Sequence, residues 1–571
     1  MRGCTGRAAS SRVFTRAAIT GLLSAVAALA AAADAAKTAP LLKVLIAPGS
    51  MSQSTGQGTV DVTLQVPGMN VAAGAPAMSL DVMVPGQPGP QSVTDVSLSD
   101  SQGDVPLSSR MPGPEQWIAG RAVKGDAVIH YRLPLENVTP ISGGPPTNLR
   151  IDGDGFSGIG SALIMQPKVS GSYAVAIDWD LAAMGRGAEG VSSFGDGNIR
   201  LEPGPVKRLK ETVFMAGHVQ REPIKPAGAF SAVWLGDPGF DPHPAMQWTA
   251  RLHSFMSEFF REKTEPPYRV FLRYNPMNAG GGAALYHSFI ATYGTGVTGE
   301  NLKAILGHEM THTFTANELG NWYNEGTAVF YEALLPWRAH LFTTDDYLRD
   351  VNLTASRYYT NKLRNTPEDQ VQPHFWEDTR IRVLPYDRGA MYFAVLDGKV
   401  RRASGGKRSI DDLIRDMNER MRTGQPINEA AWLDLLRRSL GPDGVAIHRA
   451  MLRGGLMLPD SDGFGPCFRR VMRQIPGFEL GFDSKSLVGP HKVIKGLIPD
   501  SQAAKAGLRD GDVVTYAVSL DAVQADVNRT LTLNATRDGK TYPITYLPRG
   551  EPVDAYQWER IANVPDSSCQ R

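Results

Sequence analysis

Hydrophobic and polar residues alternate along short runs in the first third of the chain. Such runs occur at 60–66 (VDVTLQV), 78–84 (MSLDVMV), 127–133 (AVIHYRL) and 173–179 (YAVAIDW), and clusters of Gly, Pro and Ser separate them. A period of two is typical of strands with one buried face. The pattern therefore predicts an N-terminal β-sandwich-like domain over residues 37–208.

The pattern changes after about residue 208. Two apolar runs, 231–236 and 268–275, are typical of strands. Between them, apolar and aromatic residues from Trp248 to Phe260 recur at helical spacing, which predicts a helix over 245–263. Helical patterns then dominate to about residue 456. Strands followed by helices favour an α+β domain over 209–470.

The region 475–550 is again rich in short strands punctuated by glycine. It contains FELGFD (478–483), followed by VIKGLIPDSQAAKAGLRDGDVV (493–514). These two segments resemble a PDZ domain. The resemblance implies that Leu480, Gly481 and Phe482 form a loop that binds the C-terminus of a peptide through backbone N–H groups. Residues 551–571 are interpreted as a C-terminal tail.

The N-terminus has the pattern of a signal peptide. Arg2, Arg7, Arg12 and Arg16 precede an apolar run at 17–33, and small residues follow at 33–36. A membrane anchor is the alternative, but the run is short and Ala-rich. We expect residues 1–36 to be removed, leaving an exported, periplasmic protein with no membrane span.

Charge and cysteine content bear on the possible partners of the protein and on whether it contains a disulfide. The chain has 59 Lys and Arg against 58 Asp and Glu, a net charge of +1, which gives no reason to expect nucleic acid as a partner. Cys4 would leave with the signal peptide, so Cys467 and Cys569 remain. They can form a disulfide or stay as two free thiols, because sequence alone does not give their separation.

The segment 307–326 (GHEMTHTFTANELGNWYNEG) contains candidate metal ligands and a candidate catalytic base. Residues 299–315 are predicted to form a helix, on which His308 and His312 lie one turn apart and can share one Zn²⁺. A second helix begins near Trp322 and would bring Glu325 to the pair as a third ligand, with water at the fourth position. Glu309 would act as the general base on that water. A solvated polar helix face is the alternative for the HExxH pattern alone.

With HEMTH and WYNEG in place, the chain resembles gluzincin metallopeptidases, and most closely the glycyl aminopeptidase family. The resemblance implies an N-terminal β domain, a thermolysin-like catalytic domain and a C-terminal PDZ domain, with peptides as substrates. A similar segment in such enzymes, here 383–397 (VLPYDRGAMYFAVLD), implies that Tyr386 stabilises the tetrahedral intermediate. The segment 268–288 resembles their substrate-binding edge strand, in which Gly280, Gly281 and Gly282 would let a peptide approach. A flexible glycine loop is the alternative for these three residues.

The sequence departs from that family at two points. The stretch GGGAAL lacks the glutamate that grips a free amino group in the clan's aminopeptidases, and the interval from His312 to Glu325 is shorter than usual. An aminopeptidase-like enzyme is the principal interpretation, with an endopeptidase as its alternative. Two further hypotheses are a peptide-binding scaffold with an inactive core and a zinc hydrolase acting on other esters or amides.

Overall fold

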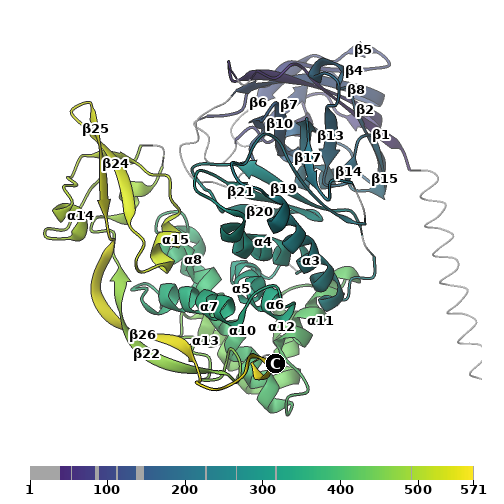
Figure 1. The fold of residues 1–571 in the computed structure, drawn as a ribbon. Helices are drawn as coiled ribbons and strands as arrows, with labels where there is room; N and C mark the ends of the chain where they lie inside the picture. Colours follow the sequence, from purple (N-terminus) through teal and green to yellow (C-terminus); the bar gives the residue numbers. More distant parts are fainter. Residues whose placement is uncertain are drawn as a thin grey trace, which may run out of the picture.

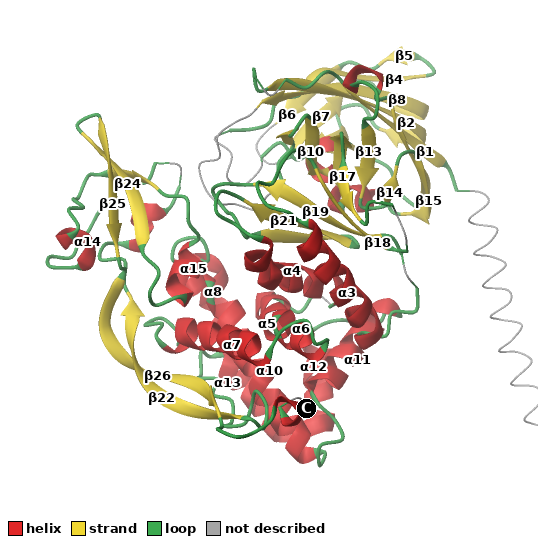
Figure 2. Cartoon of the chain, viewed as in Figure 1, coloured by secondary structure: helices red, strands yellow, loops and turns green. Residues whose placement is uncertain are grey.

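The computed structural model describes residues 39–569, except for 53, 84–88, 111–113, 137–146, 226–227, 265, 316–317 and 490. The predicted signal peptide lies outside these residues. Figures 1 and 2 show a β-rich N-terminal part, a helical middle part and a smaller C-terminal part beside the helices. No helix among the described residues combines the length and apolar character needed to cross a bilayer.

The N-terminal part consists of three sheets around one apolar core. The largest has the order β15-β12-β1-β2-β8-β4-β5, formed by β1 (Leu41–Pro48), β2 (Gln57–Val71), β4 (Thr94–Asp100), β5 (Gly103–Asp104), β8 (Val123–Glu136), β12 (Tyr173–Trp179) and β15 (Ile199–Gly204). The second has the order β14-β13-β16-β10-β9, formed by β9 (Arg150–Asp152), β10 (Gly155–Ile159), β13 (Glu189–Ser192), β14 (Gly195–Asp196) and β16 (Val213–Gly217). The third has the order β11-β3-β7-β6, formed by β3 (Pro76–Leu80), β6 (Leu107–Arg110), β7 (Glu115–Ala119) and β11 (Gln166–Pro167). The alternation seen in the sequence matches the burial of these strands, as in β1, where every second residue is buried.

The junction with the middle part differs from the predicted boundary at residue 208. β16 follows that boundary, yet it pairs with β10 and β13 of the N-terminal part. Its Val213 and Met215 pack with Val233 and Phe271 of the next sheet in one apolar cluster. The two parts therefore meet face to face through buried side chains.

The middle part begins with a five-stranded sheet of order β17-β18-β19-β21-β20. Its strands are β17 (Gln220–Glu222), β18 (Phe230–Trp234), β19 (Tyr268–Tyr274), β20 (Gly282–Leu285) and β21 (Ser288–Tyr293). β18, β19 and β21 are parallel, whereas β20 runs antiparallel to β21 and forms the edge. The helix α3 (His243–Phe259) connects β18 to β19 and confirms the predicted aromatic helix.

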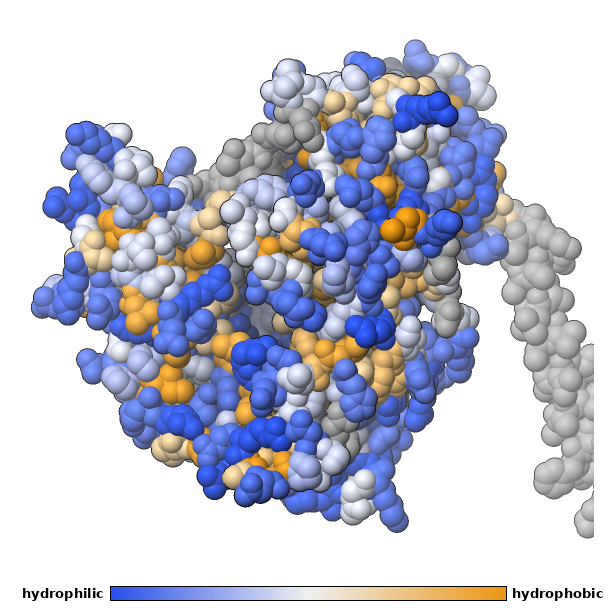
Figure 3. All heavy atoms as spheres, viewed as in Figure 1, coloured by the Kyte–Doolittle hydropathy of each residue, from blue (hydrophilic) through white to orange (hydrophobic). Residues whose placement is uncertain are grey.

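Helices make up the rest of the middle part. They are α4 (Gly299–Phe314), α5 (Asn321–Glu332), α6 (Leu334–Arg338), α7 (Thr344–Tyr359), α8 (Glu368–His374), α9 (Thr379–Arg382), α10 (Leu384–Ala403), α11 (Ile410–Arg422), α12 (Glu429–Leu440) and α13 (Pro442–Leu452). One large apolar core runs through them and under the five-stranded sheet. On the face drawn in Figure 3, hydrophilic residues predominate and hydrophobic residues form small, scattered groups.

The C-terminal part has two pieces. A long two-stranded ribbon pairs β22 (Phe468–Phe478) with β26 (Arg549–Arg560). Between them lies what we call the C-terminal unit, residues 479–548, with its own apolar core and the elements α14 (Gln502–Lys505), β23 (Val513–Thr515), α15 (Leu520–Ala525), β24 (Leu531–Arg537) and β25 (Lys540–Tyr546).

The segment interpreted as a tail is therefore largely ordered structure. Most of β26 falls within residues 551–571, and Cys569 forms a disulfide with Cys467. Both cysteines are fully buried in the core of the helical part. The disulfide, rather than the alternative of two free thiols, fastens the end of the chain to the start of the ribbon.

Candidate metal centre

The helix α4 places the two candidate histidines. Thr298 caps its first turn by accepting a hydrogen bond from the backbone N–H of Asn301, whose side chain bonds back to Thr298. Leu302, Leu306 and Met310 are fully buried in the core. This fixes the rotation of the helix, so the neighbouring stripe with the histidines faces α5.

Close backbone contacts bring α5 and α10 to the site. A Cβ atom on Gly307 of α4 would lie 2.6 Å from the carbonyl oxygen of Glu332 on α5. A Cβ atom on Gly326 of α5 would lie 2.7 Å from the Cα atom of Gly389 on α10. Only glycine permits such approaches. Three helices can therefore converge on one point.

Three ligand atoms meet there. The Nε2 atoms of His308 and His312 are 3.1 Å apart, and Glu325 Oε2 lies 3.4 Å from the first and 3.3 Å from the second. Among the described residues, these three form the one group of at least three His, Cys, Asp or Glu side chains that could hold a metal ion. The structure thus brings together the three residues that the sequence singled out.

The outer hydrogen bonds of the histidines test whether a cation fits. His308 Nδ1 lies 2.6 Å from Glu332 Oε2, and His312 Nδ1 lies 2.8 Å from Asn324 Oδ1. Because each outer partner is an acceptor, each Nδ1 carries the proton and donates it. Loss of any proton on Nε2 when a metal binds would leave both Nε2 lone pairs facing one point together with the Glu325 carboxylate. Such a set of acceptors, two nitrogens and one oxygen, suits Zn²⁺.

Charge within the group supports the same arrangement. Burial opposes ionisation of Glu325, but its hydrogen bonds to His308 and His312 hold its pKa well below the ordinary value. Glu325 is therefore an anion throughout the physiological range and can act as a metal ligand.

Sequence reasoning missed Glu332. It follows Glu325 by seven residues, two helical turns, and so lies on the same face of α5. This spacing is the sequence feature from which the position of Glu332 beside the site could have been predicted. Asn324 is not the cap of α5, because the N-cap position belongs to Gly320; its side chain contacts His312 instead.

Glu309 of α4 has a buried side chain that packs against the edge strand β20. Burial raises its pKa, while the neighbouring His308 and His312 and a hydrogen bond from the Ala284 backbone N–H act in the opposite direction. A Cβ atom at position 282 would lie 2.5 Å from Glu309 Cγ. The predicted base therefore lies directly beneath the predicted substrate strand.

The three predicted glycines occupy different places. Gly282 begins β20, whereas Gly280 and Gly281 lie in the preceding turn, where their backbone N–H groups donate to the backbone oxygen and the hydroxyl of Thr292, respectively. Gly280 has a φ of +81°. Of the three, Gly282 is the one in contact with the candidate site.

Tyr386 lies in the first turn of α10, beside the metal ligands. Its ring stacks on His308 at a centroid separation of 6.0 Å and an angle of 13°. Burial raises the pKa of its phenol well above the ordinary value, and the Glu325 carboxylate adds to the shift. Tyr386 therefore stays protonated and can donate a hydrogen bond.

The predicted peptide-binding loop is not part of this centre. Leu480 and Phe482 are buried in the separate core of the C-terminal unit. The carbonyl of Gly481 accepts a hydrogen bond of 2.8 Å from the Ile498 backbone N–H. The structure thus places the loop and the candidate metal ligands in different cores.

No family model and no curated protein matches the sequence. An aminopeptidase N family protein from Idiomarina loihiensis has a similar structure, with a TM-score of 0.65 and 14% identity over 91% of this chain and 98% of that one. An M1 zinc metallopeptidase from Deinococcus radiodurans, a mutant bound to a Tyr-Ser-Ala substrate, has a TM-score of 0.47 and 14% identity over 74% of this chain and 95% of that one. Leukotriene A4 hydrolase from Saccharomyces cerevisiae has a TM-score of 0.43 and 14% identity over 72% and 66%, respectively. The chain therefore has the multidomain α+β fold of an aminopeptidase N family protein, with a zinc-like His308–His312–Glu325 group in its helical part.

Proposed function

We propose that this chain is an exported, zinc-dependent peptidase of the gluzincin type. The observation that carries the proposal is the convergence of three ligand atoms beside a buried glutamate and a protonated tyrosine. A zinc ion held by His308, His312 and Glu325 would supply a Lewis acid that polarises water and the scissile carbonyl.

Side chains of the protein carry out the remaining steps. Glu309 accepts a proton from the attacking water, and its raised pKa helps it to hand that proton to the leaving amine. Tyr386 donates a hydrogen bond to the oxyanion of the tetrahedral intermediate. Glu332 and Asn324 keep the two imidazoles in the tautomer that exposes Nε2.

The edge strand supports a peptide as the substrate. The N–H group of Ala284 points toward Glu309 and away from β21, so the backbone groups of Gly282 face the same free edge. A peptide in an extended conformation can pair with that edge and cross the centre. Gly282–Leu285 contains no acidic residue to hold an amino group, which favours the endopeptidase alternative.

Zinc content and peptide cleavage test the proposal together. Purified mature protein and its Glu309→Gln variant are analysed for zinc and incubated with a mixed peptide library. Zinc in both and cleavage by the wild type alone are expected, and the positions of the cuts distinguish an aminopeptidase from an endopeptidase. Zinc without cleavage would favour a non-peptidase hydrolase. A folded protein that takes up no zinc would favour the scaffold.

The C-terminal unit is proposed to be a PDZ domain whose loop Leu480–Gly481–Phe482 binds a peptide C-terminus, as in the glycyl aminopeptidase architecture. Truncation after Pro476 would also remove β26 and Cys569, and would therefore perturb the helical part. A binding experiment on the intact chain avoids this problem. Peptides with a free carboxylate should bind, and the same peptides with amidated ends should not.

Export is proposed from the N-terminal pattern alone. The mass of the protein recovered from the periplasmic fraction gives the test, because removal of residues 1–36 leaves a defined shorter chain. Recovery of the uncleaved chain from membranes would favour the anchor.

A further inference from the structure

The C-terminal unit makes a charged contact with the helix that precedes Tyr386. Asp521, in the first turn of α15, accepts two hydrogen bonds from Arg382, at 2.7 Å from Nη2 and 3.1 Å from Nε. The Thr379 hydroxyl donates to the same carboxylate. This is a two-pronged guanidinium–carboxylate pair, which fixes orientation as well as distance.

The contacted helix is too short to hold its own position. α9 comprises four residues, Thr379–Arg382, and a single turn is not stable without tertiary partners. Asp378 caps its start, and Arg382 at its end also lies over the Trp376 ring at 5.9 Å. Val383 connects α9 directly to α10. Arg382 is therefore one helical turn before Tyr386, and a shift of α9 would move that phenol.

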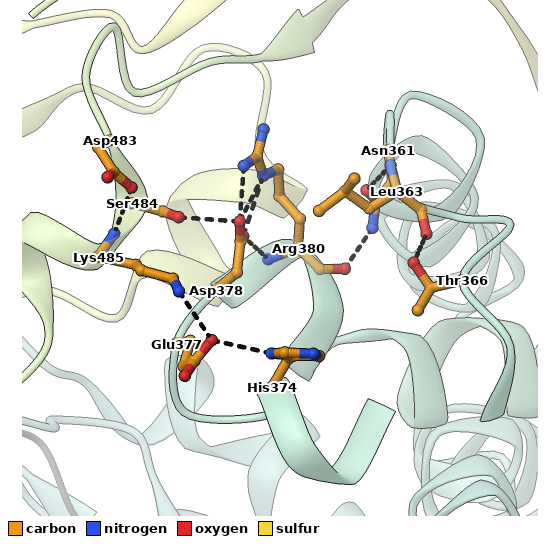
Figure 4. A network of polar contacts seen from close by, with 10 residues as sticks. All are labelled: Asn361, Leu363, Thr366, His374, Glu377, Asp378, Arg380, Asp483, Ser484 and Lys485. Carbon is orange, nitrogen blue, oxygen red and sulfur yellow. Dashed lines mark hydrogen bonds and ion pairs between the residues drawn. The ribbon is translucent and has the colours of Figure 1, made fainter. Parts of the chain in front are cut away.

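A second set of contacts ties the C-terminal unit to the same region. Figure 4 shows Ser484 donating to Asp378 at 2.9 Å and Lys485 paired with Glu377 at 3.4 Å. In the same view Arg380 binds the Asp378 carboxylate, so the cap of α9 is held from both sides.

The ribbon fixes the C-terminal unit from below. Asn352 of α7 donates its amide to the carbonyl of Trp558 and accepts from the backbone N–H of the same residue, both at 2.8 Å. The Cys467–Cys569 disulfide closes the ribbon at its far end. At the other end of the ribbon, Arg549 donates to the carbonyls of Val523 and Asp526, in and next to α15. Because the ribbon is held at both ends, α15 can serve as a rigid support for α9.

We propose that Asp521 is a positioning residue for Tyr386, so that the C-terminal unit forms part of the catalytic apparatus for every substrate, short or long. The proposal rests on the proposed peptidase function and assigns Asp521 a role that peptide recruitment does not require.

The test uses a short chromogenic peptide that is too small to reach the C-terminal unit. Asp521→Asn, which preserves shape, and Asp521→Ala should lower kcat about 10- to 100-fold with KM and zinc content nearly unchanged. The loss should not exceed that of Tyr386→Phe. In a Tyr386→Phe background, Asp521→Ala should have little further effect, because both substitutions remove the same contribution.

The control is Lys362→Ala, which breaks an exposed ion pair with Glu479 across the same interface. It should leave kcat unchanged. If Asp521→Asn keeps wild-type kcat on short peptides and loses activity only on long ones, the proposal is wrong and recruitment accounts for the unit.

Amide hydrogen exchange over residues 379–390 separates this proposal from the peptidase function. Asp521→Ala should increase exchange there, and Lys362→Ala should not. If no variant cleaves any peptide, the peptidase function fails, and the exchange result alone decides whether Asp521 holds α9. Unchanged exchange in Asp521→Ala would overturn the positioning role.

Discussion

Gly282 of the edge strand β20 and Glu309 of α4 are in direct contact. A Cβ atom at position 282 would lie 2.5 Å from Glu309 Cγ and 2.7 Å from Oε1. Real Cβ atoms do not approach other atoms so closely, so a side chain at 282 and the present position of Glu309 are incompatible. The glycine predicted to admit substrate also makes room for Glu309, the proposed general base.

We therefore expect Gly282→Ala to displace the Glu309 carboxylate by a fraction of an ångström or more. Since a shift of about 1 Å in a catalytic group costs roughly 100-fold in rate, kcat should fall by about 10- to 100-fold. Zinc content and melting temperature should stay near those of the wild type. Steady-state kinetics with metal analysis makes the measurement. An unchanged kcat would show that Glu309 tolerates the methyl group.

The parts of the site that are local in sequence could be predicted from it. HEMTH specifies its own helix, and WYNEG lies close enough along the chain for Glu325 to meet the histidines. Glu332 was predictable in principle, because the period of α5 places it on the face of Glu325.

The parts that depend on distant pairing could not. β26 pairs with β22, about eighty residues earlier, and the local sequence of residues 551–560 does not indicate which strand it pairs with. Asp521 meets Arg382 across 139 positions. An ion pair between two units carries no sequence signal of its own, since acidic and basic residues are common throughout the chain. Contacts of this kind are specified by how whole units pack.

Removing the carboxylate of Glu332 should weaken metal binding. Its 2.6 Å hydrogen bond orients His308 and makes Nε2 a better donor. Loss of such outer partners typically costs 10- to 100-fold in metal affinity, so Glu332→Ala should raise the zinc Kd by about that factor. Competition with a chelator of known affinity gives the measurement. Glu300→Ala, at an exposed carboxylate on the first turn of α4, is the matched control and should leave Kd unchanged.

The disulfide should contribute substantially to stability. Cys467 and Cys569 are 102 positions apart, so their bond closes a long loop and removes much of the entropy of the unfolded chain. Replacing both by serine should lower the free energy of unfolding by about 2–5 kcal/mol. Denaturant titration compares the variant with the wild type under non-reducing conditions. A wild type that loses no stability on reduction would contradict the role of the bond.

A buried histidine outside the ligand group should make the fold sensitive to acid. His253 of α3 lies against Tyr268 at a centroid separation of 4.2 Å, with Phe230 and Phe314 at 5.8 Å. Burial lowers its pKa from 6.5 to about 4. Between these two values the unfolded chain binds a proton that the folded chain does not, so stability falls as pH decreases from 6.5 toward 4.

Over the interval from pH 6.5 to pH 5.0, the loss due to His253 should be about 1.6 kcal/mol, because the unfolded histidine is half protonated at pH 6.5 and almost fully protonated at pH 5.0. His253→Phe keeps a ring in the aromatic cluster and cannot be protonated, so its stability should fall less on acidification by that amount. Denaturant titrations of zinc-free wild type and variant at both pH values make the comparison and cancel the contribution of the metal ligands. Equal losses in the two proteins would show that His253 accepts a proton in the folded state at its ordinary pKa.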